Sequence, residues 1–290
     1  MPDFLANFFN LMQAEPAFFI FVSVVLGLMI GSFLNVVIHR LPKMMELEWQ
    51  RNCEEMQGNE PPETSKYNLV VPRSACPQCG HKITAMENIP VISYLFLRGK
   101  CSGCKTAISF RYPLIEALTG VLAGLISWHF GYSAMAVAAW VFTFALITLT
   151  FIDFDTHYLP DDITLPLLWL GLIFNLNGGF TDLHSALIGA IAGYLSLWSV
   201  YWLFKLVTGK EGMGYGDFKL LAAIGAWFGW QLLPAVILLS SLAGSIIGIG
   251  LIVLTKHGRN VPIPFGPYLA LGGIAALFLG PQLSAFYLGA

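Results

Sequence analysis

An uncharged stretch of 36 residues decides the fold class: residues 220–255 read LLAAIGAWFGWQLLPAVILLSSLAGSIIGIGLIVLT. As one helix this stretch would extend for about 54 Å, whereas about 20 residues suffice to cross the hydrocarbon layer of a membrane. The stretch is therefore too long for a single span. We divide it near residues 229–234 into two predicted membrane spans.

The composition of the whole chain agrees with a membrane protein. Of its 290 residues, 56% are hydrophobic and 11% are charged, against roughly 45–50% and about 25% in soluble domains. A formal net charge of −2 provides no basic field for binding nucleic acid, which excludes that class of partner. The 22 Phe, 8 Trp and 10 Tyr exclude a disordered chain.

Six further uncharged runs predict membrane spans, so we expect an all-α polytopic membrane protein of about eight transmembrane helices. Two of the six are weaker, because one carries Glu116 near its end and another is short and contains Pro166. The six runs are residues 17–38, 113–130, 133–152, 163–177, 185–204 and 266–289.

The positive charges support eight spans rather than seven. Ten of the 15 Lys and Arg residues lie in residues 40–111, and the others follow the predicted fifth and seventh spans. With eight spans, all fifteen fall on one face, which the positive-inside rule makes cytoplasmic, and both termini are periplasmic. No Lys or Arg precedes the first apolar run, which also exceeds the length of a signal peptide core, so we expect a retained span.

This arrangement predicts three parts: a first span in residues 1–38, a cytoplasmic insert in residues 39–112, and a seven-helix membrane domain in residues 113–290. Residues 44–65 of the insert predict a short helix or a mobile linker. Its charges form either a solvated face or an acidic surface for a basic peptide. Its six glutamates are Glu46, Glu48, Glu54, Glu55, Glu60 and Glu63.

The insert also contains two paired cysteine motifs, Cys76-Pro-Gln-Cys79 and Cys101-Ser-Gly-Cys104. This spacing is typical of a zinc ribbon, in which four thiolates complete a closed tetrahedral site. Disulfides are the alternative, but the predicted cytosolic location disfavours them. A closed four-sulfur site has no water to activate, so we expect structural zinc. Cys53 is assigned no role.

Two groups of carboxylates lie next to predicted spans, where charged groups are rare. The first, Ile152-Asp-Phe-Asp-Thr-His-Tyr-Leu-Pro-Asp-Asp162, follows the third span, and the second, Gly212-Met-Gly-Tyr-Gly-Asp-Phe-Lys219, precedes the sixth. Because two spans separate the groups, both lie on the cytoplasmic face, where Asp153 and Asp217 can meet. Two facing carboxylates that share one proton are the minimal machinery for hydrolysing a peptide bond through an activated water.

The glycines and acids around this pair have ordinary interpretations as well. Gly214 and Gly216 permit positive φ and a close approach of a substrate backbone, although glycine-rich turns are common. Asp161 or Asp162 is placed to act as the N-cap of the following helix.

The basic residues of these segments are expected to be structural. His81 and His157 are most simply ordinary loop histidines. Lys219 either favours the ionised form of the carboxylate pair or serves as a positive anchor at the membrane face.

Several motifs, in order along nearly the whole chain, resemble those of bacterial type IV prepilin peptidases, which are GxGD-type aspartic proteases. They are Gly31-Ser-Phe-Leu-Asn-Val-Val-Ile-His-Arg-Leu-Pro42, the paired cysteines, Asp153 with Leu159-Pro-Asp161, Gly214-Tyr-Gly-Asp217-Phe-Lys219 and Pro264-Phe-Gly-Pro267. The resemblance selects Asp153, rather than Asp155, Asp161 or Asp162, as the partner of Asp217. It also supports zinc at the four cysteines, which match family members that retain the metal module.

The resemblance implies an inner-membrane enzyme with two activities, serving pilus biogenesis and type II secretion. The first removes the short basic leader of prepilins and pseudopilins, and the second methylates the new N-terminal amine, usually of Phe, with S-adenosylmethionine. The sequence contains no glycine-rich nucleotide-binding fingerprint. The methyl donor therefore rests on the resemblance alone, and we assign it no residues.

Three other classes remain possible from the residues alone. The first is a transferase for lipid-linked phosphates, in which Asp153, Asp155, Asp161 and Asp162 bind Mg²⁺. The second is an ion-coupled transporter, for which ionisable groups are expected in the middle of the membrane rather than at span ends. The third is a zinc-ribbon membrane scaffold, in which both aspartates would be replaceable.

Overall fold

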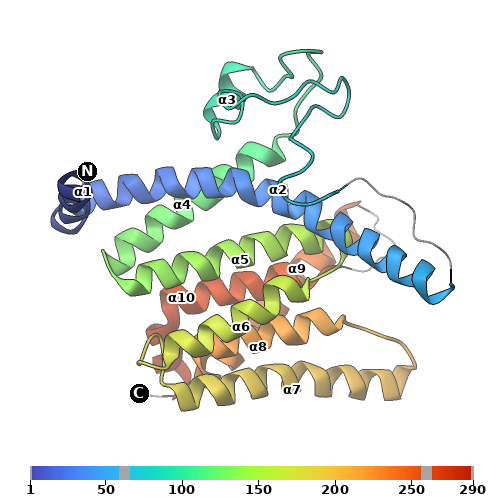
Figure 1. Cartoon of the computed structure of the whole chain (residues 1–290). Helices are drawn as coiled ribbons and strands as arrows, with labels where there is room; N and C mark the ends of the chain where they lie inside the picture. The colour runs from blue at the N-terminus through green and yellow to red at the C-terminus, as the bar shows by residue number, and fades with distance from the viewer. Residues whose placement is uncertain (1, 59–65, 256–262, 289–290) are drawn as a thin grey trace. The chain divides into compact units, whose positions relative to one another are not determined.

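The computed structural model describes residues 2–58, 66–255 and 263–288, which are mostly helical (Figure 1). In these ranges the only β-structure is two isolated bridges, Ala75 with Lys82 and Lys100 with Ala107. The chain divides into two compact units, Met1–Trp140 and Val141–Ala290.

The first unit is built on two long helices that pack closely. It contains α1 (Pro2–Ala14), α2 (Pro16–Met56), the short α3 (Ile92–Phe96) and α4 (Arg111–Phe130), and α5 (Ala134–Thr156) begins at its end. A Cβ atom added to Gly27 would lie 2.7 Å from Cβ of Ala123. The absence of a side chain at this glycine therefore allows the backbones of α2 and α4 to approach, as in many membrane helix pairs.

Helix α2 extends far beyond the predicted first span. It has 41 residues and continues through Pro42 to Met56, a length of about 60 Å. Residues 44–56 of the acidic segment therefore continue this helix and do not form a separate one. Glu60, Glu63 and the two prolines between them lie outside the described residues.

The second unit contains two short α-helices among longer ones. After α5 come α6 (Asp161–Asn175), α7 (Leu183–Thr208), α8 (Tyr215–Phe228), η1 (Trp230–Leu232), α9 (Leu233–Thr255) and α10 (Gly266–Leu288). Figure 1 shows α5 to α10 running roughly along one direction. Helix α8 packs against α6, α7 and α10, and every residue from Leu220 to Phe228 is buried. The short helix that carries Asp217 is thus held from several sides.

The predicted division of residues 220–255 is found in the structure. Helix α8 ends at Phe228, and Gly229 follows with a φ of +81°, a left-handed conformation that favours glycine. The 3₁₀ turn η1 then leads into α9, whose second residue is Pro234. A proline is tolerated there because the first turn of a helix has no partner for its N–H group.

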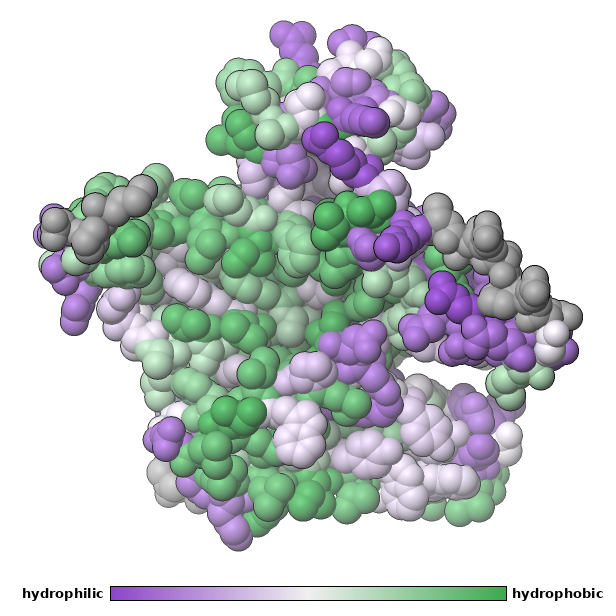
Figure 2. Space-filling view, in the orientation of Figure 1, coloured by the Kyte–Doolittle hydropathy of each residue, from purple (hydrophilic) through white to green (hydrophobic). Residues whose placement is uncertain are grey.

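Six helical segments of the described chain are long and apolar enough to cross a membrane. Helices α6 and α8, with 15 and 14 residues, are shorter. Each of the eight predicted runs coincides with a helix, but eight crossings remain a prediction. Hydrophobic side chains cover much of the visible surface of the helices in Figure 2, as expected for a protein in contact with lipid. The six segments are Pro16–Met56, Arg111–Phe130, Ala134–Thr156, Leu183–Thr208, Trp230–Leu251 and Gly266–Phe286.

Candidate active site and metal centre

Asp153 lies near the C-terminal end of α5 and is buried, with 4% of its surface exposed. Its Oδ2 accepts a hydrogen bond from the backbone N–H of Gly266 at 3.0 Å. That N–H belongs to the first residue of α10, where amide groups have no partner within the helix. The start of α10 therefore fixes one carboxylate oxygen of Asp153.

Asp217 lies in the first turn of α8 and is 7% exposed. Gly214 is the N-cap residue of this helix, and its carbonyl accepts a hydrogen bond from the Asp217 N–H at 3.3 Å. Both carboxyl groups are thus buried at helix ends, one at the end of α5 and the other at the start of α8. In the first acidic group, by contrast, Asp155, Asp161 and Asp162 are exposed.

Leu159 connects the segments that carry the two aspartates. A Cβ atom added to Gly216 would lie 2.7 Å from Cβ of Leu159, and one added to Gly266 would lie 3.1 Å from its Cδ2. The Gly266 position would also place a Cβ atom 2.6 Å from Asp153 Oδ2. Both glycines are therefore required by close packing around Leu159.

This packing corrects the interpretation of the glycine-rich turn. Among the described glycines, those with positive φ do not include Gly214 or Gly216. The space beside Gly216 is filled by the side chain of Leu159 of the same chain and is not left open for a substrate backbone.

Lys219 of α8 pairs with Asp161 of α6. Its Nζ lies 2.7 Å from both carboxylate oxygens of Asp161. The prediction that Asp161 or Asp162 is the N-cap of α6 is wrong, because the N-cap residue of α6 is Pro160 and both aspartates lie in its first turn. This pair was not predicted from the sequence, although a lysine near the N-terminal end of α8, where the helix dipole disfavours a positive charge, was a signal of it.

His157 terminates α5. Its φ is +54°, and its N–H donates to the carbonyl of Asp153 at 2.9 Å. The side chain is exposed, as the interpretation of an ordinary loop histidine requires.

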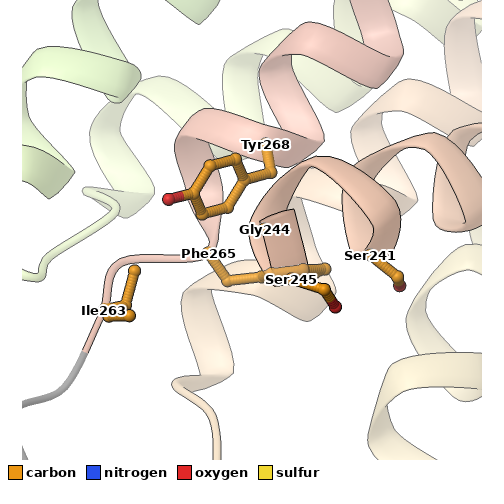
Figure 3. A pocket seen from close by; sticks show the side chains of 6 residues that line it. All are labelled: Ser241, Gly244, Ser245, Ile263, Phe265 and Tyr268. Atoms are coloured by element: carbon orange, nitrogen blue, oxygen red, sulfur yellow. The ribbon is translucent and has the colours of Figure 1, made fainter. Parts of the chain in front are cut away.

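An open cavity of about 320 Å³ lies between α9 and the segment that enters α10. In Figure 3 its two sides are visible, with the aromatic residues on the α10 side and the small residues on α9. Phe265, which lines the cavity, directly precedes Gly266, but neither Asp153 nor Asp217 lines it. Its lining residues are Ser241, Gly244, Ser245, Ile263, Phe265 and Tyr268.

The four paired cysteines form a single cluster in the first unit. Each pair lies on a similar turn, closed by a hydrogen bond from Gly80 N to Cys76 O at 2.9 Å or from Lys105 N to Cys101 O at 3.0 Å. All four Sγ atoms lie within 4.8 Å of one another. Cys53 in α2 is a free cysteine outside this cluster.

The geometry and chemistry of this cluster fit a tetrahedral metal ion. Four sulfurs about 2.3 Å from zinc lie roughly 3.8 Å apart. The Sγ atoms of Cys76 and Cys104 are 3.8 Å apart, and those of Cys79 and Cys101 are 4.0 Å apart. The hydroxyl of Thr106 lowers the pKa of the Cys104 thiol to about 6, which favours the thiolate form that binds metal.

The close approach of the four sulfurs also affects the pKa of Cys79. The backbone N–H of His81 favours the thiolate of Cys79, but the Cys104 sulfur raises the Cys79 pKa to about 11. A divalent cation bound by the four sulfurs would favour the thiolate form of Cys79 as well. The ring of His81 lies 3.2 Å from the Glu87 carboxylate, and the four-cysteine cluster does not include it.

Two buried charged residues attach the cysteine-containing segment to its helices. Arg40 of α2 donates to the carbonyls of Asn68, at 2.9 Å, and Pro72. Glu116 of α4 accepts from the N–H of Val91 at 2.7 Å. From the sequence, Arg40 was part of the charge count and of the Gly31–Pro42 motif, and Glu116 only weakened the prediction of its span; neither contact was predicted.

The fold and these sites define a multi-pass membrane protein with a buried pair of aspartates and a four-cysteine centre. Models of two families match the chain: the bacterial peptidase A24 N-terminal domain over residues 25–130 and the type IV leader peptidase family over residues 140–249. The chain belongs to the type IV leader peptidase family.

Curated relatives match over almost the full length. A prepilin leader peptidase/N-methyltransferase of Pseudomonas aeruginosa is 56% identical over 278 residues, covering 96% of both chains. A protein of the same name from Aeromonas salmonicida is 58% identical over 265 residues, covering 90% of this chain and 91% of its own. One from Aeromonas hydrophila is 55% identical over 290 residues, covering 98% and 99%. No solved structure matches.

Proposed function

We propose that Asp153 and Asp217 are the catalytic pair of this enzyme, a prepilin peptidase with N-methyltransferase activity in the bacterial inner membrane. The observation that carries the proposal is the burial of these two carboxyl groups at helix ends that are joined through the packing of Gly216 and Gly266 against Leu159. Two such groups cannot both be ionised at close range, so the pair shares a proton.

The roles of the pair follow from its hydrogen bonds. The N–H of Gly266 stabilises a negative charge on Asp153, which favours Asp153 as the base that removes a proton from the attacking water. Asp217 then donates the shared proton to the oxygen of the scissile carbonyl, and a tetrahedral diol forms. When the C–N bond breaks, a proton passes to the leaving amine.

The substrates are type IV prepilins and pseudopilins. Hydrolysis removes the basic leader, and methylation of the new N-terminal amine uses S-adenosylmethionine as methyl donor. We assign no residue to the methyl donor. These activities support pilus biogenesis and type II secretion, and the substrate's own apolar helix, which lies in membrane lipid, holds it beside the enzyme.

The distribution of charge supports a sidedness for the site. Every Lys and Arg falls on one face in the eight-span arrangement, so both termini are periplasmic, whereas the aspartates and the cysteines lie on the cytoplasmic side. The leader of a prepilin lies on the same, cytoplasmic side of the membrane. We further propose that the metal of the four-cysteine cluster is zinc, which supplies rigidity and no catalysis because four thiolates leave no open position.

The alternative classes are not favoured. Among the described residues, the only group of three or more His, Cys, Asp and Glu side chains suited to a metal is the cysteine cluster. The four aspartates required for a magnesium-dependent transferase therefore do not gather. The buried aspartates also lie at helix ends and not in mid-membrane, as a transporter would require.

The test is incubation of the purified protein with a synthetic prepilin N-terminal peptide, with and without S-adenosylmethionine, followed by mass spectrometry. We expect the wild type to release the leader. With the methyl donor, the mass of the mature fragment should increase by about 14 Da, the mass of one methylene group. Asp153→Asn and Asp217→Asn should each abolish cleavage. Asp155→Asn, which alters an exposed acid two residues away, is the matched control and should cleave. Normal cleavage by Asp153→Asn would refute the assignment.

A further inference from the structure

We infer that the ion pair between Asp161 and Lys219 is a positioning device that holds Asp217 in register with Asp153. The inference rests on the proposed catalytic role of these two aspartates. It assigns a function to two charged residues that do not take part in the chemistry themselves.

The lysine contacts both carboxylate oxygens of the aspartate. Lys219 Nζ lies 2.7 Å from Oδ1 and 2.7 Å from Oδ2 of Asp161, residues 58 positions apart in the sequence. The side chain of Lys219 is 29% exposed and that of Asp161 is 52% exposed. A pair that remains partly open to water adds little to overall stability, so stability alone gives no strong reason for placing the two charges here.

The placement of Lys219 indicates a local role. It is the fifth residue of α8, just past the first turn and still near the positive end of the helix dipole, and the anion Asp161 faces it. Asp161 lies in the first turn of α6, where an anion is favourable. The N-terminal parts of two helices are thereby joined by one pair of charges.

Lys219 is also oriented away from the reacting atoms. Residues two apart on a helix do not share a face, so Lys219 and Asp217 point in different directions from α8. The lysine therefore cannot replace Asp217 as proton donor, and it acts through the position of the helix turn.

The pair completes a frame around Asp217. On one side of it, Gly216 packs against Leu159, and on the other, Lys219 binds Asp161. Leu159 and Asp161 belong to the short segment that follows Asp153 along the chain. Two contacts, one apolar and one ionic, thus hold the N-terminal part of α8, on both sides of Asp217, against the segment that follows Asp153.

Cleavage kinetics of purified Asp161→Asn and Lys219→Met test this inference. Each should lower kcat by about tenfold or more, because small displacements of catalytic groups carry penalties of this size, and should change KM little. The charge swap Asp161→Lys with Lys219→Asp should restore most of the lost kcat. Asp162→Asn, which removes the adjacent acid of the same helix turn, is the matched control and should stay within about twofold of the wild type.

Three results would overturn the inference: unchanged kcat in Asp161→Asn, a swap no better than the single variants, or an effect of Asp161→Asn on KM alone, which would make Asp161 a contact for the basic leader. Should the single variants fold poorly by thermal unfolding, the comparison moves to Lys219→Arg, which keeps the charge and should keep kcat. A wild type that does not cleave would instead refute the proposed function, so the two failures are distinguishable.

Discussion

Single atoms decide the geometry around Asp153. Gly266 supplies the N–H that binds Oδ2, and an added Cβ atom at this residue would lie 2.6 Å from the same oxygen. The residue therefore has to be a glycine for steric reasons and not because of its φ.

We predict that Gly266→Ala lowers kcat for cleavage by about tenfold or more, because the new methyl group displaces the Asp153 carboxylate. The measurement is the rate of leader release from a synthetic peptide. Gly250→Ala in α9, where an added Cβ atom meets nothing within 4 Å, is the control and should cleave at the wild-type rate. Equal rates for the two variants would contradict the steric explanation.

The sequence identified Asp153 and Asp217 as candidates but not what holds them. Their proximity to spans and their return to one face follow from counting charges and crossings. The Gly266 bond and the Asp161–Lys219 pair join residues 113 and 58 positions apart. Such pairings depend on how helices pack, which periodicity and spacing do not specify.

At the scale of elements, Asn175 fastens the end of α6 to the end of α8. Its buried side chain donates to the carbonyls of Ala226 and Trp227, each at 2.9 Å, and accepts from the N–H groups of Phe180 and Thr181. Carbonyls at a helix C-terminus have no partner within the helix. One amide thus satisfies groups from two segments.

We predict that Asn175→Ala lowers the free energy of unfolding by about 2–3 kcal/mol, because it leaves buried backbone groups without partners. A lowered midpoint of thermal unfolding in detergent measures the effect. Asn177→Ala changes an exposed asparagine of the same turn and should leave the midpoint unchanged. A midpoint for Asn175→Ala that equals that of Asn177→Ala would contradict the prediction.

The cysteine cluster is the second element for which a change is predictable. Replacing any one of Cys76, Cys79, Cys101 or Cys104 by Ser should release the metal, because three thiolates no longer close the site. Metal analysis of protein purified without chelator should give about one zinc per wild-type chain. Cys53→Ser, outside the cluster, should retain it. Less than one zinc per intact wild-type chain would exclude the four-thiolate zinc site.

Element boundaries were predictable where the chain has charges, glycine or proline, and less so elsewhere. The break after Phe228 follows from the length of the uncharged run and is found at Gly229. The continuation of α2 through Pro42 was not foreseen, since charged residues after a span give no sign of where a helix ends. The division into three parts at residues 38 and 112 stays a prediction.

At the scale of the whole molecule, the distribution of charged residues bears on the capture of the substrate as well as on the membrane topology. The helical extension of α2 carries Glu46, Glu48, Glu54 and Glu55, and the sequence adds Glu60 and Glu63. In the proposed topology this segment lies on the side of the basic leader. Exposed charges steer an encounter over about 8 Å at physiological ionic strength and contribute little to holding a formed complex.

We therefore predict that changing Glu46, Glu48, Glu54 and Glu55 together to Gln slows capture of a prepilin at low salt, while kcat at saturating substrate is unchanged. The measurement is kcat/KM against salt concentration. It should fall with salt in the wild type and be low and nearly flat in the variant, because screening removes the same attraction that the substitutions remove. Glu15→Gln, just before α2 and on the periplasmic side of the proposed topology, should behave as wild type. Equal capture by the fourfold variant and the wild type at low salt would show that the acidic segment is an ordinary solvated surface.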